Sequence, residues 1–296
     1  MSRPALSVVV PTKDRADKLS GCLDALCREV RADDEVIVVD SASSDDATRN
    51  VAERHGVHYL RAERAGTSLA RNLGWKAARY DYIAFVDDDI LVAPGWATAM
   101  ATALSAPDVA FVTGRIDLSP DQDDTIDAVS LLPDPDPRPL GRESRGLFGM
   151  SANAGIHRHA LAAINGFDTR LGPATWFGGG EDNDFFDRLV YAGFRGRYDP
   201  TVQVWHLQWR SGRAYLSVQW AYGKGMGARF AKALLRDGRR AFVLLPEVTR
   251  LGGVRTAVSD VRTRSRRSWA PPIAWRLGVL AGFLVGLVRL RGDHSA

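Results

Sequence analysis

Apolar and polar positions follow two alternating periods along residues 1–118. Short continuous apolar runs, typical of strands buried on both faces, are separated by stretches in which apolar residues recur every three or four positions, as in helices. The runs predict strands at 5–12, 35–39, 57–63, 81–86 and 109–118. The stretches between them predict helices at about 19–30, 44–55, 67–80 and 93–106. This alternation predicts an α/β fold, with a mixed, mainly parallel sheet and helices on both faces.

Residues 119–146 interrupt this pattern, because they are rich in Pro and Asp and lack a long apolar period. They predict a surface loop. Further along, the pattern predicts a helix at 181–194, a strand at 202–208, and either one long helix or two shorter ones, broken at 223–227, within 213–238. We therefore divide the chain into 1–118, a variable loop at 119–146, a second half at 147–212, and a helical extension at 213–296.

Two local signals refine the element boundaries. Pro11 is expected to end the first strand, because proline cannot donate to a strand ladder. Thr67 or Ser68 is expected to cap the helix at 67–80, because a hydroxyl can accept a bond from an unpaired N–H of the first turn.

Polar residues follow three of the predicted strands at their carboxyl ends, where open α/β sheets bind ligands. These are residues 11–15, Asp40, and the adjacent Asp87, Asp88 and Asp89. Adjacent carboxylates repel one another and lose hydration in a concave site, so they indicate a nearby cation. An Asp-x-Asp at a strand end can hold Mg²⁺ or Mn²⁺, which can neutralise a diphosphate. A solvated turn is the alternative for the triplet.

Other residues could complete such a site. Arg71 could face a diphosphate, and Asp40 could accept a bond from a base N–H or a sugar hydroxyl, or form a turn. Glu181 and Asp182 follow three glycines, where a general base and an ordinary acidic helix start are both open. Trp176 and Phe177 could stack on a sugar, and His206 is either a ligand or a core histidine.

Six blocks, taken together, resemble the family 2 glycosyltransferases with the GT-A fold. They are SVVVPTKDRADKL, EVIVVDSASSDD, GTSLARNLGWKAA, YIAFVDDDI, NGFDTRLG and GGGEDNDFFDRL, and their order and spacing extend over about 5–210. The resemblance implies transfer of a sugar from a UDP-, GDP- or dTDP-sugar, with inversion at the anomeric carbon. It makes 1–118 the nucleotide-sugar-binding half and 147–212 the acceptor and catalytic half.

The resemblance also implies roles for individual residues. Contacts to the donor are expected from Pro11, Lys13, Arg15, Asp40, Arg71, Asp88 and Asn153. A Mn²⁺ or Mg²⁺ ion is expected at Asp87, Asp89 and His206, and the catalytic base is expected at Asp182, next to Glu181. The Gln-x-x-Arg-Trp motif of processive members is absent from HLQWRSG, which predicts addition of one sugar or few.

Charge is divided unevenly along the chain. The net charge is +4, but residues 225–296 hold 14 Lys and Arg against 4 Asp and Glu. A basic run begins at Arg262, and the apolar run at 273–290 includes Arg276, so it falls short of the about 20 apolar residues of a membrane span. Two alternatives stay open: a core helix after a solvated linker, or an interfacial helix within 255–290 on an anionic membrane, which would suit a lipid-linked acceptor.

The remaining features limit location and class. Two cysteines, Cys22 and Cys27, predict small buried residues in a reducing cytosol, and no secretory leader is expected, so the protein is expected in the cytoplasm or on the inner face of the plasma membrane. No nucleic-acid partner is expected, since no recognition motif accompanies the basic run. A nucleotidylyltransferase and a non-catalytic nucleotide-sugar-binding protein are alternatives, although the first loop lacks the glycines usual in the former.

Overall fold

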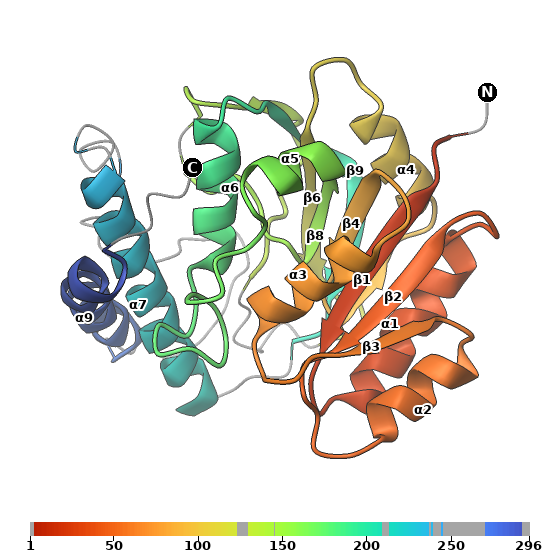
Figure 1. Ribbon diagram of the computed structural model, residues 1–296, viewed down its shortest axis with the longest axis horizontal. Helices are drawn as coiled ribbons and strands as arrows, with labels where there is room; N and C mark the ends of the chain where they lie inside the picture. The colour runs from red at the N-terminus through yellow and green to blue at the C-terminus, as the bar shows by residue number, and fades with distance from the viewer. Residues whose placement is uncertain are drawn as a thin grey trace.

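The fold is a single mixed sheet with helices on both sides (Figure 1). The computed structural model describes residues 3–122, 130–144, 146–208, 213–236, 238, 244 and 270–291. Its strands are β1 (Leu6–Thr12), β2 (Glu35–Asp40), β3 (His58–Arg61), β4 (Tyr82–Val86), β5 (Ile90–Val92), β6 (Phe111–Leu118), β7 (Arg138–Leu140), β8 (Asn153–His157) and β9 (Gly196–His206). Its helices are α1 (Ala16–Glu29), α2 (Ala47–Arg54), α3 (Thr67–Ala77), α4 (Trp96–Leu104), α5 (Arg158–Ala163), α6 (Glu181–Tyr191), α7 (Arg213–Arg236) and α9 (Ala270–Arg289).

The sheet confirms the predicted mixed α/β class. The strand order is β3-β2-β1-β4-β8-β6-β9-β5, with β7 paired to β9. The block β3-β2-β1-β4 is parallel, as the alternating strands and helices predict. The predicted fifth strand, β6, does not lie beside β4, because β8 is inserted between them and is antiparallel to both. The short NAGIH run of β8 carries no clear strand period, so the sequence did not predict it.

Two boundary predictions were wrong. Pro11 does not end β1: it lies in register with Val39, and the strand continues to Thr12. The ladder between β1 and β4 ends at Val9 and Phe85, so Pro11 lies beyond it. Helix α3 is capped by neither Thr67 nor Ser68, because Gly66 is its N-cap residue.

Two further predictions need correction. Residues 119–146 do not form only a loop, since β7 adds a short strand beside β9 and Ile116 bridges to Leu132; residues 123–129 and 145 lie outside the described part of the chain. Of the two cysteines on α1, Cys22 is buried as predicted, but Cys27 is exposed.

The C-terminal helices pack against each other through glycines. Helix α7 is one continuous helix. Of the two alternatives left by the sequence, the structure therefore shows one long helix and not two shorter ones. A Cβ atom on Gly223 would lie 2.1 Å from the Trp275 carbonyl oxygen, and one on Gly227 would lie 2.1 Å from that of Val279. A step of four residues along α7, from Gly223 to Gly227, corresponds to a step of four residues along α9, from Trp275 to Val279. The two helices therefore run parallel, with their backbones in close contact. In Figure 1, α7 lies between α9 and the rest of the molecule.

Helix α9 is only half covered. Trp275, Val279 and Leu290 are buried, whereas the opposite side of the helix is exposed. Of the two alternatives left open by the sequence, a fully buried core helix therefore does not describe that side. Across the part of the chain that the structure describes, none of the helices is long and apolar enough to cross a membrane.

Candidate functional site

The carboxyl ends of β1 and β4 bring the first polar loop and the aspartate triplet together. Thr12 Oγ1 donates a hydrogen bond to Asp88 at 2.7 Å, and Arg15 Nη1 donates to the other oxygen of Asp88 at 3.0 Å. Arg15 Nη1 also lies 3.5 Å from Asp89 Oδ2. The predicted meeting of these loops at one edge of the sheet is therefore confirmed.

The burial of Asp88 and Asp89 costs free energy, because their carboxyl groups lose hydration. Both are nearly fully buried, with Asp88 only 3% exposed. Burial, followed by the neighbouring charge of Asp89, raises the pKa of Asp88 to about 6, although Arg15 and Thr12 act in the opposite direction. Buried carboxylates with a raised pKa at the carboxyl end of a strand are typical of functional sites.

His206 reaches the same cluster from β9. Its Nε2 atom lies 3.4 Å from Asp89 Oδ1, and its Nδ1 atom lies 2.8 Å from the Gln208 carboxamide nitrogen. The backbone is fixed here as well, because Leu207 N donates to the Asp89 carbonyl at 2.9 Å. The imidazole therefore presents Nε2, and not Nδ1, to the aspartates.

A second cluster of carboxylates surrounds Arg71 on α3. Its Nη2 donates to Asp87 Oδ1 at 2.6 Å, and its Nη1 lies 3.7 Å from Asp182 Oδ1 and 3.9 Å from Glu181 Oε1. Arg71 is only 2% exposed, yet its Nε and Nη1 have no hydrogen-bond partner among the described residues. A buried guanidinium with unused donors is a suitable contact for an anionic group.

Glu181 and Asp182 occupy the first turn of α6, directly after three glycines. Burial and then the charge of Asp182 raise the pKa of Glu181 to about 7. Burial also raises the pKa of Asp182, while Arg71 and a hydrogen bond from the Ser151 hydroxyl lower it. Carboxyl groups with raised pKa values are suited to accept a proton near neutral pH.

Helix α7 is joined to α6 by buried ion pairs. Arg229 makes a bidentate ion pair with Asp187, with nitrogen–oxygen distances of 2.8 and 3.0 Å. Lys232 Nζ bridges Asp184 at 2.5 Å and Asp168 at 2.7 Å. All of these side chains are nearly fully buried. The acidic turn of α6 is therefore fixed by a helix that lies outside the blocks on which the sequence prediction rests.

The glycine loop before α6 also contacts α7. Gly180 has φ +88°, a left-handed conformation that favours glycine. A Cβ on Gly225 of α7 would lie 2.5 Å from the backbone nitrogen of Gly180. The two backbones thus touch at a point where no side chain fits.

The side chains of Asp40 and Asn153 form hydrogen bonds with other groups of the protein. Asp40 is buried and accepts bonds from Ser43 N at 2.7 Å, Tyr59 Oη at 2.7 Å and Arg61 Nη1 at 2.9 Å. Asn153 is buried too, and its carboxamide contacts Trp96, Arg115 and Val202. Their predicted contacts with a donor stay predictions, and this arrangement does not add support for them.

The other predicted residues are placed as follows. Lys13 is exposed and pairs with Asp14, whereas Pro11 is buried within β1. Phe177 is buried in a small apolar cluster that includes Leu171, so it is not free to stack on a sugar. Trp176 is exposed and stays a candidate for such stacking.

Sequence reasoning assigned no role in this region to four residues: Ser151, Gln208, Arg229 and Lys232. Ser151 lies 31 positions from Asp182, and Arg229 lies 42 positions from Asp187. No local pattern links residues so far apart. The sequence analysis treated the glycines at 223–227 only as a possible break in the helix.

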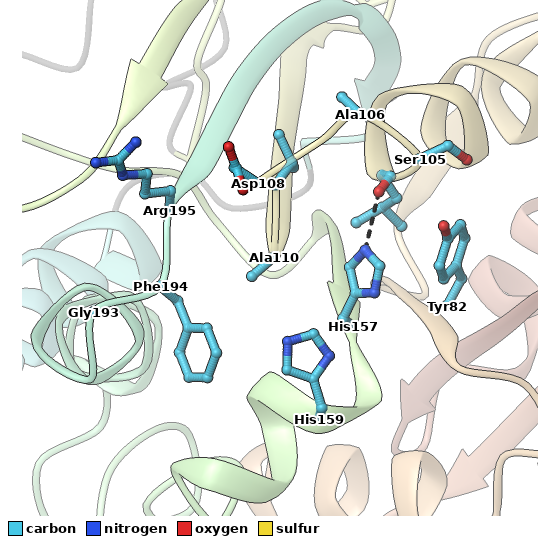
Figure 2. A pocket seen from close by; sticks show the side chains of 12 residues that line it. Tyr82, Ser105, Ala106, Asp108, Ala110, His157, His159, Gly193, Phe194 and Arg195 are labelled. Carbon is cyan, nitrogen blue, oxygen red and sulfur yellow. Dashed lines mark hydrogen bonds between the residues drawn. The ribbon is translucent and has the colours of Figure 1, made fainter.

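A separate hollow lies at the other end of β4. It encloses about 530 Å³ and is lined by residues that include Tyr82, Asp108, His157, His159 and Arg195. His157 Nε2 contacts the Leu104 carbonyl oxygen at 3.0 Å (Figure 2). Tyr82 begins β4, whereas the aspartates follow its last residue, so this hollow is not part of the site.

The aspartates fit a divalent metal only as a partial site. Within the described ranges, no three His, Cys, Asp or Glu side chains form a ready-made metal site. Asp89 and His206 nevertheless face each other, and Mg²⁺-type sites often use one or two carboxylates together with substrate phosphates. The donor set therefore suits an ion that arrives with a phosphate-bearing ligand.

Known relatives of the chain are sugar-transferring enzymes. The pre-mycofactocin glycosyltransferase of Mycobacterium tuberculosis (strain ATCC 25618 / H37Rv) is 28% identical over 228 residues, covering 74% of this chain and 46% of that protein. The chondroitin synthase of Escherichia coli is 36% identical over 109 residues, covering 35% and 16%. The validoxylamine A glucosyltransferase of Streptomyces hygroscopicus subsp. jinggangensis (strain 5008) is 35% identical over 111 residues, covering 35% and 26%. The chain spans less than half the length of each of these relatives.

Solved structures share the fold. A mannosyltransferase from Pyrobaculum calidifontis, in complex with GDP-Man and Mn²⁺, matches with a TM-score of 0.63 and 18% identity, covering 96% of this chain and 88% of that one. S. aureus TarS 1-349 matches with a TM-score of 0.61 and 15% identity, covering 96% and 81%. These neighbours confirm the predicted GT-A fold.

The family model described as "Glycosyl transferase family 2" matches residues 7–164, just over half of the chain. This range covers β1, apart from Leu6, to β8, and it includes Arg15, helix α3 with Arg71, and the aspartate triplet. The chain belongs to glycosyl transferase family 2.

Proposed function

We propose that the protein transfers one sugar, with inversion, from a UDP-, GDP- or dTDP-sugar to a hydroxyl of a glycan, a lipid-linked or another acceptor. The observation that carries this proposal is Arg71, which lies between the triplet and the acidic turn, 2.6 Å from Asp87 and 3.7 Å from Asp182. A donor diphosphate beside the triplet would have its sugar directed toward Asp182. The solved neighbour with GDP-Man and Mn²⁺ supports a nucleotide-sugar donor.

The reaction needs a proton acceptor on one side of the sugar and a stabilised leaving group on the other. Asp182 takes the proton of the acceptor hydroxyl, whose oxygen forms a bond to the anomeric carbon. The bond from that carbon to the diphosphate oxygen breaks, and its electron pair leaves with the nucleoside diphosphate. Arg15 and Arg71 supply positive charge near that diphosphate.

A divalent ion, Mn²⁺ or Mg²⁺, would be held by Asp89 and His206, with Asp87 nearby, and would stabilise the negative charge of the leaving diphosphate. Asp88 is tied to Thr12 and Arg15, which suits a role in shaping the nucleotide pocket. Glu181 lies beside the base and shares its buried environment.

The test of the function is a screen for released nucleotide. Purified full-length protein is incubated with UDP-, GDP- and dTDP-sugars, each with Mn²⁺ or with EDTA. We expect slow release of one nucleotide, dependent on metal, because water can replace the acceptor. Sugar transfer that is equally fast in EDTA would contradict the metal assignment. Formation of a nucleoside triphosphate and a sugar 1-phosphate when pyrophosphate is added to the nucleotide sugar would indicate a nucleotidylyltransferase instead.

Replacing Arg71 should change the pH dependence of this reaction. Asp182 must be ionised to act as base, so kcat falls as the pH drops through its pKa. Arg71 lowers that pKa, so Arg71→Gln should move the acid limb of kcat to higher pH. Arg71→Lys, which keeps the charge, should leave the limb near that of the wild type. The measurement is kcat against pH at saturating donor, and an unmoved limb in Arg71→Gln would contradict the assignment of the base.

The contact between α7 and the glycine loop predicts a second effect. Gly225→Ala should displace Gly180 and with it the acidic turn, lowering kcat by about tenfold or more, because small misplacements of catalytic groups are costly. Gly223→Ala meets α9 instead, and Gly21→Ala meets open space. Thermal unfolding measured on all three variants separates stability from rate. Equal loss of kcat in Gly223→Ala and Gly225→Ala would show that the loop contact has no special role.

A further inference from the structure

Helix α9 has an apolar outer face. We call the outer stripe the set of its five large apolar side chains that point away from α7: Ile273, Leu277, Leu280, Leu284 and Val288. Each of them is between 51% and 70% exposed within the described part of the chain. Their spacing of three or four residues places them along one side of the helix, over about 22 Å at 1.5 Å per residue. An exposed row of this kind is typical of an interaction surface.

The charge around the outer stripe has one sign. Residues 270–291 contain no Asp or Glu, and their three arginines, Arg276, Arg289 and Arg291, are all exposed. A further basic run, which begins at Arg262, precedes α9 in the sequence, although its structure lies outside the described residues. A row of apolar side chains on a helix whose only charged residues are arginines complements a surface that is apolar beneath and anionic on top.

The other face of α9 cannot be exposed without breaking the fold. Trp275 is buried, and the glycines of α7 and α9 bring the two backbones into contact. Helix α9 therefore has only one side available. A helix that is apolar on one side and basic at its edges lies in the plane of a membrane interface and does not cross it.

The end of α9 lies close to the segment that leads into the acidic turn. The Arg289 guanidinium is 5.7 Å from the centre of the Trp176 ring, and Lys224 Nζ is 4.7 Å from it. Trp176 is itself exposed and lies just before the glycine loop. Exposed indole rings next to basic groups are frequent where proteins meet the headgroup layer.

We propose that the outer stripe and its flanking arginines dock the protein on the surface of a membrane that contains anionic lipids, with α9 lying in the headgroup plane. Docking goes beyond the proposed function, because it needs neither donor nor metal. Its consequence for catalysis does rest on the proposed function: an acceptor carried by the membrane would be presented on the side where Trp176 and the acidic turn lie.

Vesicle flotation of the full-length protein tests this proposal. The vesicles are made of phosphatidylcholine with or without phosphatidylglycerol, and neither donor nor metal is added. We expect the wild type to float with the anionic vesicles and less with the neutral ones. Leu277→Glu/Leu284→Glu should reduce flotation by about tenfold or more, because it places two carboxylates on the outer stripe.

A matched variant controls for charge alone. Ala77→Glu/Thr98→Glu adds the same two charges at exposed positions of α3 and α4, and should float like the wild type. Circular dichroism and thermal unfolding establish that both variants fold. The proposal is overturned if the wild type does not float, if both double variants lose binding equally, or if the outer stripe instead forms a dimer that dissociates in Leu277→Glu/Leu284→Glu. Since no sugar is transferred in this assay, its failure is distinct from failure of the proposed function.

Discussion

Asp182→Asn should lower kcat by about 10³-fold and leave the affinity for the donor nearly unchanged. A positioned general base contributes about 10² to 10⁴ in rate, and asparagine keeps the size of the side chain while losing its ability to accept the proton. Donor binding should survive because Arg71 and the triplet remain. The measurement is kcat together with the donor dissociation constant of the variant.

Two neighbours of Asp182 serve as comparisons. Ser151→Ala removes the hydroxyl that donates to Asp182. It should lower kcat far less than Asp182→Asn does, because this hydroxyl only orients the carboxylate. Glu181→Gln should also retain more activity than Asp182→Asn, although both acids are buried beside Arg71. If Glu181→Gln is the more damaged variant, the base is Glu181.

Asp89→Ala should abolish metal-dependent donor binding and with it sugar transfer. Asp89 is the residue at which the triplet meets His206, so its loss removes the point where both elements could hold one ion. The expected result is no Mn²⁺-dependent rise in unfolding temperature in the presence of donor. Asp108→Asn is the control, because Asp108 lines the hollow at the opposite end of β4. An Asp89→Ala protein that transfers sugar at the wild-type rate would remove the metal assignment.

The sequence predicted the parts of the site that depend on sheet topology. Buried strands are continuous apolar runs, and the carboxyl ends of parallel strands lie at one edge, so Arg15 and the triplet could be placed together in advance. Arg71 was placed by its family block. In the structure it contacts Asp87 at 2.6 Å, and its contact with a diphosphate stays a prediction.

The remaining parts depend on contacts between distant segments. Strand β8 is antiparallel and occupies the gap between β4 and β6, which no local period could indicate. The carboxamide oxygen of Asn153, on β8, accepts a hydrogen bond from Trp96. The family resemblance had implied a contact between Asn153 and the nucleotide sugar. The support that α7 gives to the acidic turn, through Arg229 and Lys232, likewise follows from packing and not from any motif.

Calorimetric titration of the matching nucleotide sugar into the wild-type protein, with Mn²⁺ and then with EDTA, tests the central claim most directly. The claim is that the triplet, His206 and Arg71 form a metal-dependent site for a nucleotide-sugar diphosphate. It predicts saturable binding of one donor with Mn²⁺, little binding in EDTA, and none for Asp89→Ala under either condition. Equal affinity in Mn²⁺ and EDTA, unchanged by Asp89→Ala, would contradict it.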